Sequence, residues 1–234
     1  MNQFKQFMFI WLVLISLLVL GYGAPAHGTL LVDNVSKRPH YLKCVTAPTV
    51  VTPNRVVLSS DQVQLLRSAW YTASNIPSIQ GTTWNYTITS IGLRESSAGK
   101  CRVGDIQLPY HIRCDPSVSS SILLDTILKH DDWRSASYGP YQMQIRTVRQ
   151  VANVYDLAYT SQISDEQIVH LLLTDQEYAL RLAIMYLNWL ERTSQTYFQV
   201  VSRYNGGWAN MPYYLKIQQD MRTIQHLENM GCFD

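Results

Sequence analysis

A single carboxylate, Glu95, ends a mostly apolar stretch that runs from Ile88 to Lys100. In a helix, Ile88, Ile91 and Glu95 would share one face, because they are spaced at i, i+3 and i+7. We expect this face to point inward. Burial disfavours the charged form of a carboxyl group and raises its pKa, so the group can keep a proton near neutral pH. A general acid needs such a proton, whereas a glutamate that turns into solvent would be an ordinary helix end.

The composition is that of a folded domain of ordinary size. Of the 234 residues, 47% are hydrophobic and 15% are charged, which suffices for a sizeable core and excludes a disordered chain. The net charge is +2, and lysines and arginines are scattered, so the sequence has no basic stripe that would bind nucleic acid. The 15 tyrosines and 6 tryptophans suit a groove that stacks on sugars, although such rings also fill cores.

The N-terminus predicts export. Phe7–Leu20 is an apolar run of about 14 residues, which fits the core of a signal peptide and is shorter than the roughly 20 residues that span a bilayer. Small residues follow, and we expect cleavage after Ala24 or, preferably, Ala26. The prediction is a signal peptide over 1–26 and a periplasmic protein. The alternative is an uncleaved segment that anchors the protein to the inner membrane.

All four cysteines follow this segment, and an even number in an exported chain predicts two disulfides. Three pairings are possible. A Cys101–Cys114 bond would close a short local loop and leave Cys44 and Cys232 to join the two ends of the domain. A zinc site is the rival interpretation, but no C-x-x-C or H-E-x-x-H spacing is present. We therefore expect no metal.

Helical patterns dominate the chain beyond Leu58. The preceding region, 27–58, contains three prolines and predicts an extended arm with a short strand at Thr49–Val51. Cys101–Cys114 is expected to be an irregular loop. The sum is a mainly α-helical domain over 59–234. Six of the expected helices have both ends assigned, namely Ser59 or Ser60 to Ser74, Thr83–Ser97, Val118–His130, Thr147–Tyr159, Tyr197–Arg203 and Pro212–Met230. Two more are assigned by their starts, one at Ser164 and one at a capping box of Thr174 and Glu177.

Three separated pieces of the sequence carry a family resemblance. Glu95-Ser96 ends a predicted helix, Gly139–Met143 reads Gly-Pro-Tyr-Gln-Met, and Tyr204–Gly207 reads Tyr-Asn-Gly-Gly after the helical Ala183–Leu187. In this order they resemble the lytic transglycosylase domain of the goose-lysozyme type (the SLT family), with its Glu-Ser, its Gly-Leu-Met-Gln-hydrophobic stretch before Pro-x-Thr, and its Ala-x-x-Tyr-Leu helix before Ala-Tyr-Asn-Ala-Gly. The resemblance covers roughly 74–207.

The sequence also departs from that family. Arg203 stands where alanine is usual, Pro140 and Tyr141 replace leucine and methionine, and Ile145 stands where proline is expected. The gap between Glu95 and the second piece is longer than is typical. The excess lies in Cys101–Ser137, whose role stays open. The resemblance thus implies a mainly α, lysozyme-like fold with a disulfide-bearing insertion.

The resemblance implies an enzyme that needs no cofactor and acts on the glycan strands of peptidoglycan. Glu95 would be the single general acid and base that cleaves the MurNAc-β-1,4-GlcNAc bond and forms 1,6-anhydroMurNAc. It further implies that the Tyr204 hydroxyl hydrogen-bonds Glu95, while the glycine of the second piece leaves room for a sugar. The substrate-binding residues carried over are Ser96, Gly139, Tyr141, Gln142, Tyr204 and Asn205.

Structural interpretations of these residues stay open beside the functional ones. Gln142 offers an amide for an acetamido group, or it braces its own loop. Tyr204 is either a site residue or a phenol at the edge of the core. Trp133, Tyr141 and Trp208 are candidate stacking platforms, and core packing is the alternative for each.

Two further alternatives concern the function itself. A second carboxylate would favour a lysozyme-like hydrolase, and Asp131-Asp132 is the preferred pair among the acids that follow Glu95. Those acids are Asp105, Asp115, Asp125, Asp131 and Asp132. A non-catalytic wall-binding assembly module on the same fold is another possibility. As a setting we expect local wall opening for a secretion, conjugation or pilus complex.

Overall fold

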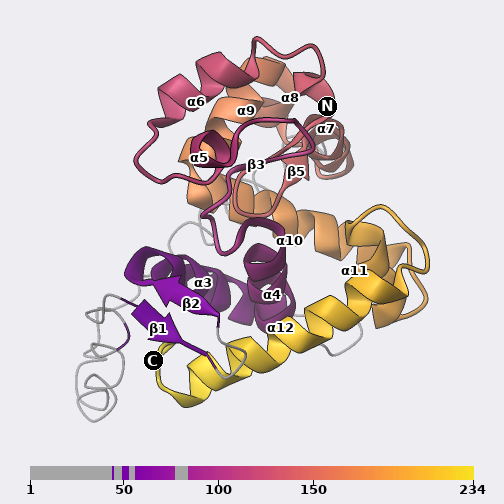
Figure 1. The fold of residues 1–234 in the computed structure, drawn as a ribbon. Helices are drawn as coiled ribbons and strands as arrows, with labels where there is room; N and C mark the ends of the chain where they lie inside the picture. Colours follow the sequence, from indigo (N-terminus) through magenta and orange to yellow (C-terminus); the bar gives the residue numbers. More distant parts are fainter. Residues whose placement is uncertain (1–43, 45–48, 53–55, 77–83) are drawn as a thin grey trace, which may run out of the picture. The chain divides into compact units, whose positions relative to one another are not determined.

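The structure is a computed structural model that describes Cys44 and residues 49–52, 56–76 and 84–234. All of them belong to the second of two compact units, Lys37–Asp234. The predicted signal peptide and most of the predicted arm lie outside the described residues. This part of the chain contains ten α-helices and two small antiparallel sheets (Figure 1), which confirms the prediction of a mainly α-helical protein. No helix within the described ranges has the length and apolarity to cross a membrane.

The elements follow one another along the chain in the order of their numbers. The helices are α3 (Ser60–Ser74), α4 (Trp84–Ser96), α5 (Tyr110–Arg113), α6 (Ser120–Ile127), a 3-10 turn (Trp133–Ser135), α7 (Ile145–Val154), α8 (Ala158–Gln162), α9 (Asp165–Thr174), α10 (Gln176–Arg192), α11 (Tyr197–Tyr204) and α12 (Met211–Asn229). The strands are β1 (Thr49–Val51), β2 (Val57–Ser59), β3 (Val103–Gly104), β4 (Ser137–Tyr138) and β5 (Met143–Gln144).

Local sequence patterns predicted several elements correctly. The strand β1 lies where it was expected and pairs with β2. Ser59 caps α3 and Ser164 caps α9, and each forms a capping box with a glutamine three residues later. In the first box, the Ser59 N–H donates to Gln62 Oε1 over 2.8 Å. Such caps satisfy N–H groups that have no partner within the helix.

Two expectations about helix ends are wrong. The expected helix over 147–159 is two helices, α7 and α8, and the chain turns between them at Asp156, whose φ is +51°. The expected box of Thr174 and Glu177 is not formed. Asp175 caps α10 instead, since its Oδ1 accepts a hydrogen bond from the Tyr178 N–H over 2.9 Å. An aspartate next to a threonine competes for the same capping position.

Helix α4 lies between the two hydrophobic clusters of the domain and packs against α3 and α12 (Figure 1). Trp84, Ile88 and Ile91 are fully buried in the larger cluster. Leu93 belongs to the second cluster, which joins β1, β2, α3 and the end of α12. Because most of its surface is covered, α4 is held firmly along its length. Glu95, one residue before its end, therefore has a fixed position.

The inserted segment between Cys101 and Ser137 supplies a strand as well as helices. Val103 pairs with Tyr138 and Gly104 pairs with Ser137, so β3 adds to the β4–β5 hairpin and forms an antiparallel sheet in the order β3-β4-β5. The stretch Cys101–Cys114, expected to be irregular, thus contains β3 and α5. The insertion builds one wall of the pocket described below.

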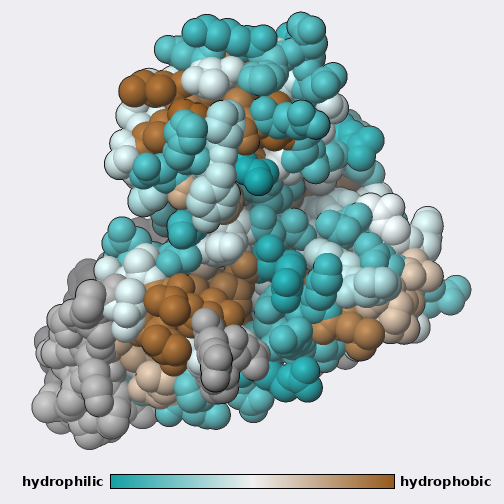
Figure 2. All heavy atoms as spheres, viewed as in Figure 1, coloured by the Kyte–Doolittle hydropathy of each residue, from teal (hydrophilic) through white to brown (hydrophobic). Residues whose placement is uncertain are grey.

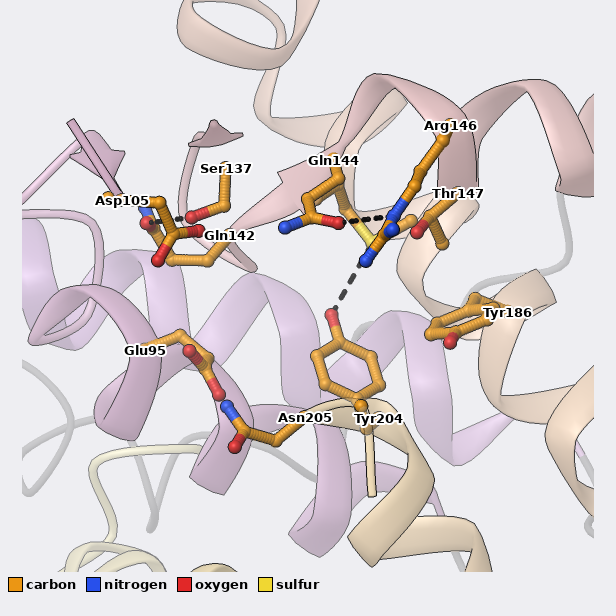
Figure 3. A pocket seen from close by; sticks show the side chains of 13 residues that line it. Glu95, Asp105, Ser137, Gln142, Gln144, Arg146, Thr147, Tyr186, Tyr204 and Asn205 are labelled. Atoms are coloured by element: carbon orange, nitrogen blue, oxygen red, sulfur yellow. Dashed lines mark hydrogen bonds between the residues drawn. The ribbon is translucent and has the colours of Figure 1, made fainter. Parts of the chain in front are cut away.

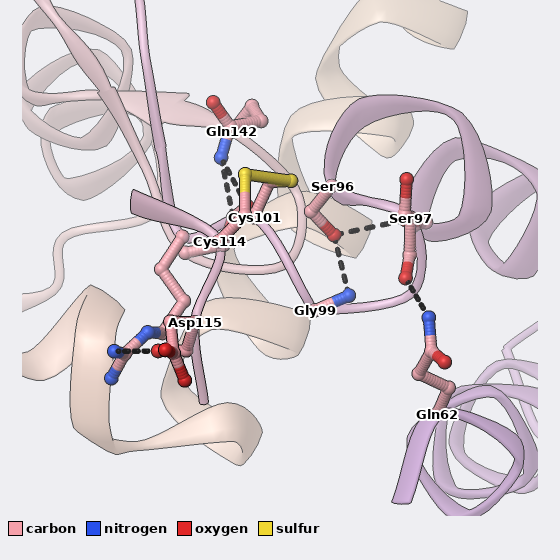
Figure 4. Close-up of a disulfide and its surroundings, with 11 residues drawn as sticks. Gln62, Ser96, Ser97, Gly99, Cys101, Cys114, Asp115 and Gln142 are labelled. Atoms are coloured by element: carbon pink, nitrogen blue, oxygen red, sulfur yellow. Dashed lines mark hydrogen bonds between the residues drawn. A yellow bond between two sulfur atoms is a disulfide. The ribbon is translucent and has the colours of Figure 1, made fainter. Parts of the chain in front are cut away.

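Both predicted disulfides are present, Cys101–Cys114 and Cys44–Cys232. The first closes a loop of 13 residues directly after α4 (Figure 4). Closing such a loop lowers the entropy of the unfolded chain and stabilises the folded state by about 3 kcal/mol. The second spans 188 residues and joins the two ends of the domain. The described residues contain no free cysteine, and this is compatible with an exported protein.

Apolar residues also reach the surface in places. Figure 2 shows hydrophobic residues over α6 and over the β1–β2 pair. Val51 and Val57 are each 57% exposed, and Ile122 is 58% exposed. Of the residues of α6, only Leu123 and Ile127 are buried. Helix α6 therefore covers the core with a narrower stripe than its apolar sequence predicts.

Candidate functional site

A polar cavity of about 510 Å³ opens beside the end of α4. Its walls come from α4, β3–β5, the start of α7, α10 and the end of α11 (Figure 3). Four of the predicted site residues line it, namely Glu95, Gln142, Tyr204 and Asn205. The other three, Ser96, Gly139 and Tyr141, do not. Segments that are far apart in the sequence therefore meet here, as expected for a binding site.

Glu95 is partly buried and projects into this cavity (Figure 3). Loss of hydration raises the pKa of its carboxyl group above the ordinary value. A hydrogen bond from Tyr213 acts in the opposite direction, and the charge of Asp105 adds to the rise. Because burial is the largest of these effects, Glu95 keeps its proton to a higher pH than an exposed glutamate does.

The hydroxyl that contacts Glu95 is that of Tyr213, on the first turn of α12. It donates to Glu95 Oε1 over 2.5 Å, and the Tyr213 side chain is 7% exposed. The resemblance implied this role for Tyr204 instead. The Tyr204 hydroxyl donates to the Tyr141 carbonyl over 2.9 Å, although it is close enough to Glu95 for that charge to raise its pKa. Sequence analysis missed Tyr213, because it lies outside the three matching pieces.

Arg94 precedes Glu95 but turns away from the cavity. Its Nε and Nη2 donate to the two carboxylate oxygens of Asp220 on α12, over 2.7 and 2.8 Å. Such a two-point ion pair fixes the orientation of both groups. It anchors the end of α4 to α12 and leaves the carboxyl group of Glu95 without an ion pair among the described residues.

A second carboxylate, that of Asp105, lines the same cavity (Figure 3). Asp105 follows β3 in a left-handed conformation with φ +63°, which aspartate tolerates better than most residues. The sequence favoured Asp131-Asp132 as a partner for Glu95. That pair is exposed and lines a second cavity of about 390 Å³, which Asp105 also lines. The turn after β3, rather than the acidic dipeptide, brings a carboxylate to the site.

Gln142 braces its own loop, which is the structural alternative that the sequence left open. Its Oε1 accepts from Ser137 Oγ over 2.9 Å, and its Nε2 donates to the carbonyls of Cys101 and Gly139 over 3.3 and 2.8 Å (Figure 4). Both amide hydrogens are engaged, so only a lone pair on Oε1 is left for a ligand. Gln142 itself has φ +47°.

Ser96 has a positioning role rather than a ligand contact. It is 1% exposed, and its hydroxyl donates to the carbonyl of Pro140 over 2.7 Å while accepting from the Gly99 N–H over 2.6 Å (Figure 4). These bonds join the end of α4 to the loop before β5. Ser96 therefore fixes the end of α4, next to Glu95, against the loop that leads into β5.

Gly139 and Tyr141 require corrections. A Cβ atom on Gly139 would lie 2.3 Å from the backbone oxygen of Leu172 in α9, so the space beside this glycine belongs to the protein and not to a sugar. Tyr141 is 2% exposed in the larger cluster, and its ring lies against Gly92 of α4. A ring this deeply buried has no face left for stacking.

Aromatic rings continue from the cavity towards the surface. Tyr186 lines the cavity, and its ring lies 5.4 Å from that of Tyr204 and 5.8 Å from that of Trp189. Of the predicted platforms, Trp133 is 6% exposed and belongs to the core, whereas Trp208 is 62% exposed. Trp208 therefore stays a candidate platform, outside the cavity itself.

The pKa of Glu95 should respond in opposite directions to two substitutions. Tyr213→Phe removes a donor that favours the carboxylate, so it should raise the pKa, whereas Asp105→Asn removes a repelling charge and should lower it. The measurement is a ¹³C NMR titration of the Glu95 carboxyl group. Tyr214→Phe, one residue further along α12, is the control and should leave the pKa unchanged. A Tyr213→Phe variant with the wild-type pKa would contradict this account.

Among the described residues, no group of three or more His, Cys, Asp or Glu side chains could hold a metal ion. No model of a known protein family matches the sequence, and neither the curated proteins nor the solved structures offer a match.

Proposed function

We propose that this protein is a peptidoglycan lytic transglycosylase with Glu95 as its single general acid and base. The observation that carries the proposal is the carboxyl group of Glu95, desolvated, raised in pKa and directed into an open polar cavity. A protonated carboxyl group in a cleft of this size is suited to deliver a proton to a glycosidic oxygen.

The proposed reaction needs only this one carboxyl group. Glu95 gives its proton to the oxygen of the MurNAc-β-1,4-GlcNAc bond, and the bond from C1 to that oxygen breaks. The Glu95 carboxylate then accepts the proton of the C6 hydroxyl of the same MurNAc. The C6 oxygen forms a bond to C1, which yields the 1,6-anhydro ring and restores the acid. Tyr213 favours the intermediate carboxylate, because it donates to Oε1.

The products of a digest test this proposal. Sacculi incubated with the purified protein should release muropeptides that end in 1,6-anhydroMurNAc, each 18 mass units below its hydrolysed counterpart, as expected for loss of one water. Mass spectrometry separates the two kinds of end. Products that carry reducing ends alone would contradict transglycosylation.

A muramidase-type hydrolase is the second candidate, and Asp105 is the observation that favours it. Its carboxylate lines the same cavity as Glu95 and acts on the pKa of Glu95 through its charge. A second carboxylate can direct a water molecule at C1. In that case the products carry reducing ends, and Asp105→Asn should lower the rate by at least about 10²-fold. Under transglycosylation the same variant keeps most of its activity and its anhydro products.

The proposed setting is the periplasm, where the enzyme opens the wall locally for a secretion, conjugation or pilus complex. The two disulfides support an oxidising compartment. The partner complex rests on the family resemblance alone. A non-catalytic wall-binding role is disfavoured by a glutamate that is desolvated at an open cavity, since a binding module has no need to keep it.

A further inference from the structure

The charges of the cavity are divided between its two sides. Figure 3 shows Glu95 and Asp105 on one side and Arg146, with Thr147 and Tyr186, on the other. Arg146 lies in the first turn of α7, close enough to Tyr186 for its charge to offset part of the rise that burial causes in the pKa of that phenol. A ligand that fills the cavity therefore meets acidic groups at one end and a guanidinium group at the other.

Arg146 is held in place but is not neutralised. Its Nε donates to Gln144 Oε1 over 2.7 Å, which leaves the two terminal nitrogens for a ligand. Arg94, Arg134, Arg149 and Arg181 each pair with a carboxylate. Arg146 is exposed, and within the described ranges no carboxylate pairs with it.

Another arginine near Tyr186 is arranged differently. The Nη1 of Arg203 donates to the carbonyl of Thr193 over 2.8 Å and to the hydroxyl of Ser194 over 2.8 Å. Its guanidinium group also stacks on Trp208 at 4.2 Å. Arg203 thus has a structural role at the end of α10. No contact of Arg146 with the described residues gives its charged group a comparable structural role.

We propose that Arg146 determines specificity by binding a carboxylate of the substrate, and this inference rests on the proposed function. A planar guanidinium with two free terminal nitrogens matches the two oxygens of a carboxylate. The 3-O-lactyl group of MurNAc is a source of such a group. It carries a free carboxylate in peptide-free glycan, and it carries the carboxylates of the stem peptide when that peptide is attached. A chitin oligomer has the same sugar backbone and no carboxylate.

The charge distribution gives the substrate one favoured direction in the cavity. A carboxylate next to Glu95 would be repelled by Asp105 and by the ionised form of Glu95 itself. Placed at Arg146, the same carboxylate is attracted and the glycosidic bond is left for Glu95. Arg146 therefore binds the substrate and orients it without touching the reacting atoms.

The test is a calorimetric binding experiment in the Glu95→Gln background, where turnover is removed. Three ligands are compared, namely peptide-bearing MurNAc-GlcNAc oligomers, the same oligomers after amidase treatment, and chitotetraose. Adding Arg146→Gln should weaken binding of at least one MurNAc ligand by about tenfold or more and leave chitotetraose unchanged. If only the peptide-bearing ligand loses affinity, Arg146 binds a carboxylate of the peptide. If the amidase-treated ligand loses affinity, Arg146 binds the lactyl carboxylate.

Two further variants serve as controls. Arg222→Gln removes the same charge from an exposed position on α12 outside the cavity, and it should bind all three ligands as the parent does. Arg146→Lys keeps the charge without the two-point geometry and should recover part of the affinity. The proposal is overturned if the Arg146→Gln variant binds every ligand as tightly as the parent. If the parent itself binds none of them, the proposed function fails and this inference fails with it.

Discussion

Glu95→Gln should reduce the release of muropeptides from sacculi by roughly 10³–10⁴-fold, within the range that general acid–base catalysis supplies. The loss should be this large because the proposed reaction uses Glu95 twice, first as acid and then as base. A glutamine has no proton to give and accepts none at any working pH. Its Oε1 can still accept the hydrogen bond from Tyr213, so the position of the side chain is preserved.

The same variant should be more stable than the wild type at neutral pH. Burial raises the pKa of Glu95 in the folded state, so the unfolded chain ionises first as the pH rises. Below the ordinary glutamate pKa the protonated Glu95 leaves the wild type about as stable as the variant. The wild type then loses stability as the pH rises through the folded-state pKa. Thermal melting of the two proteins should give similar values in acid and a higher Tm for Glu95→Gln near neutrality.

The control for both measurements is Glu177→Gln, which makes the same chemical change on an exposed face of α10. It should leave digestion and melting nearly unchanged. If Glu95→Gln protein digests sacculi as fast as wild type, Glu95 is not the acid and the proposed site is wrong. If its activity is lost together with its fold, melting will show this as a lowered Tm.

The elements that surround the site were predictable where the pattern was local. A capping serine at Ser59 or Ser60 and the apolar spacing of Ile88 and Ile91 depend only on neighbours within a few residues, and they predicted α3 and α4 to within one or two residues. The place of Glu95 on α4 was predictable in the same way, because it follows from that spacing. Local patterns did not reveal the turn at Asp156, where the backbone has a positive φ in the middle of a helical sequence.

The groups around Glu95 were harder to predict, because chain folding brings them together. Tyr213 lies 118 residues from Glu95 along the chain, and a single tyrosine in an amphipathic helix carries no sign of its partner. Asp105 was one acid among five, and only the pairing of β3 with β4 shows that it faces the cavity. Arg146 follows the second matching piece by three residues, but its lack of a carboxylate partner among the described residues is visible only in the structure.

Gly139 was predicted to leave room for a sugar, and the structure gives it a packing role instead. Its type suggested room for a ligand, but glycine is also the residue that permits a positive φ and close packing. Here φ is +74°, and the neighbour is the backbone of α9. From sequence alone the two reasons for a glycine are indistinguishable, because both depend on what lies next to the missing Cβ atom.

Gly139→Ala should therefore destabilise the domain by about 2–5 kcal/mol, the sum of a left-handed alanine and an overpacked contact. A Cβ atom would lie 2.3 Å from the Leu172 oxygen. That oxygen cannot move freely, because Leu172 is fixed in α9 and is 1% exposed. For a chain of this size, Tm should fall by roughly 5–20 °C.

Gly206→Ala is the matched control, since Gly206 also has a positive φ, of +88°, but its Cβ would meet nothing within 4 Å. It should lower stability by only about 1–2 kcal/mol, the expense of an alanine at positive φ. The difference in stability loss between the two variants then measures the effect of the contact with α9. Equal losses of stability would show that this contact is unimportant. A stable Gly139→Ala protein that had lost ligand binding alone would instead support a sugar beside Gly139, because only a ligand would then meet the added methyl group.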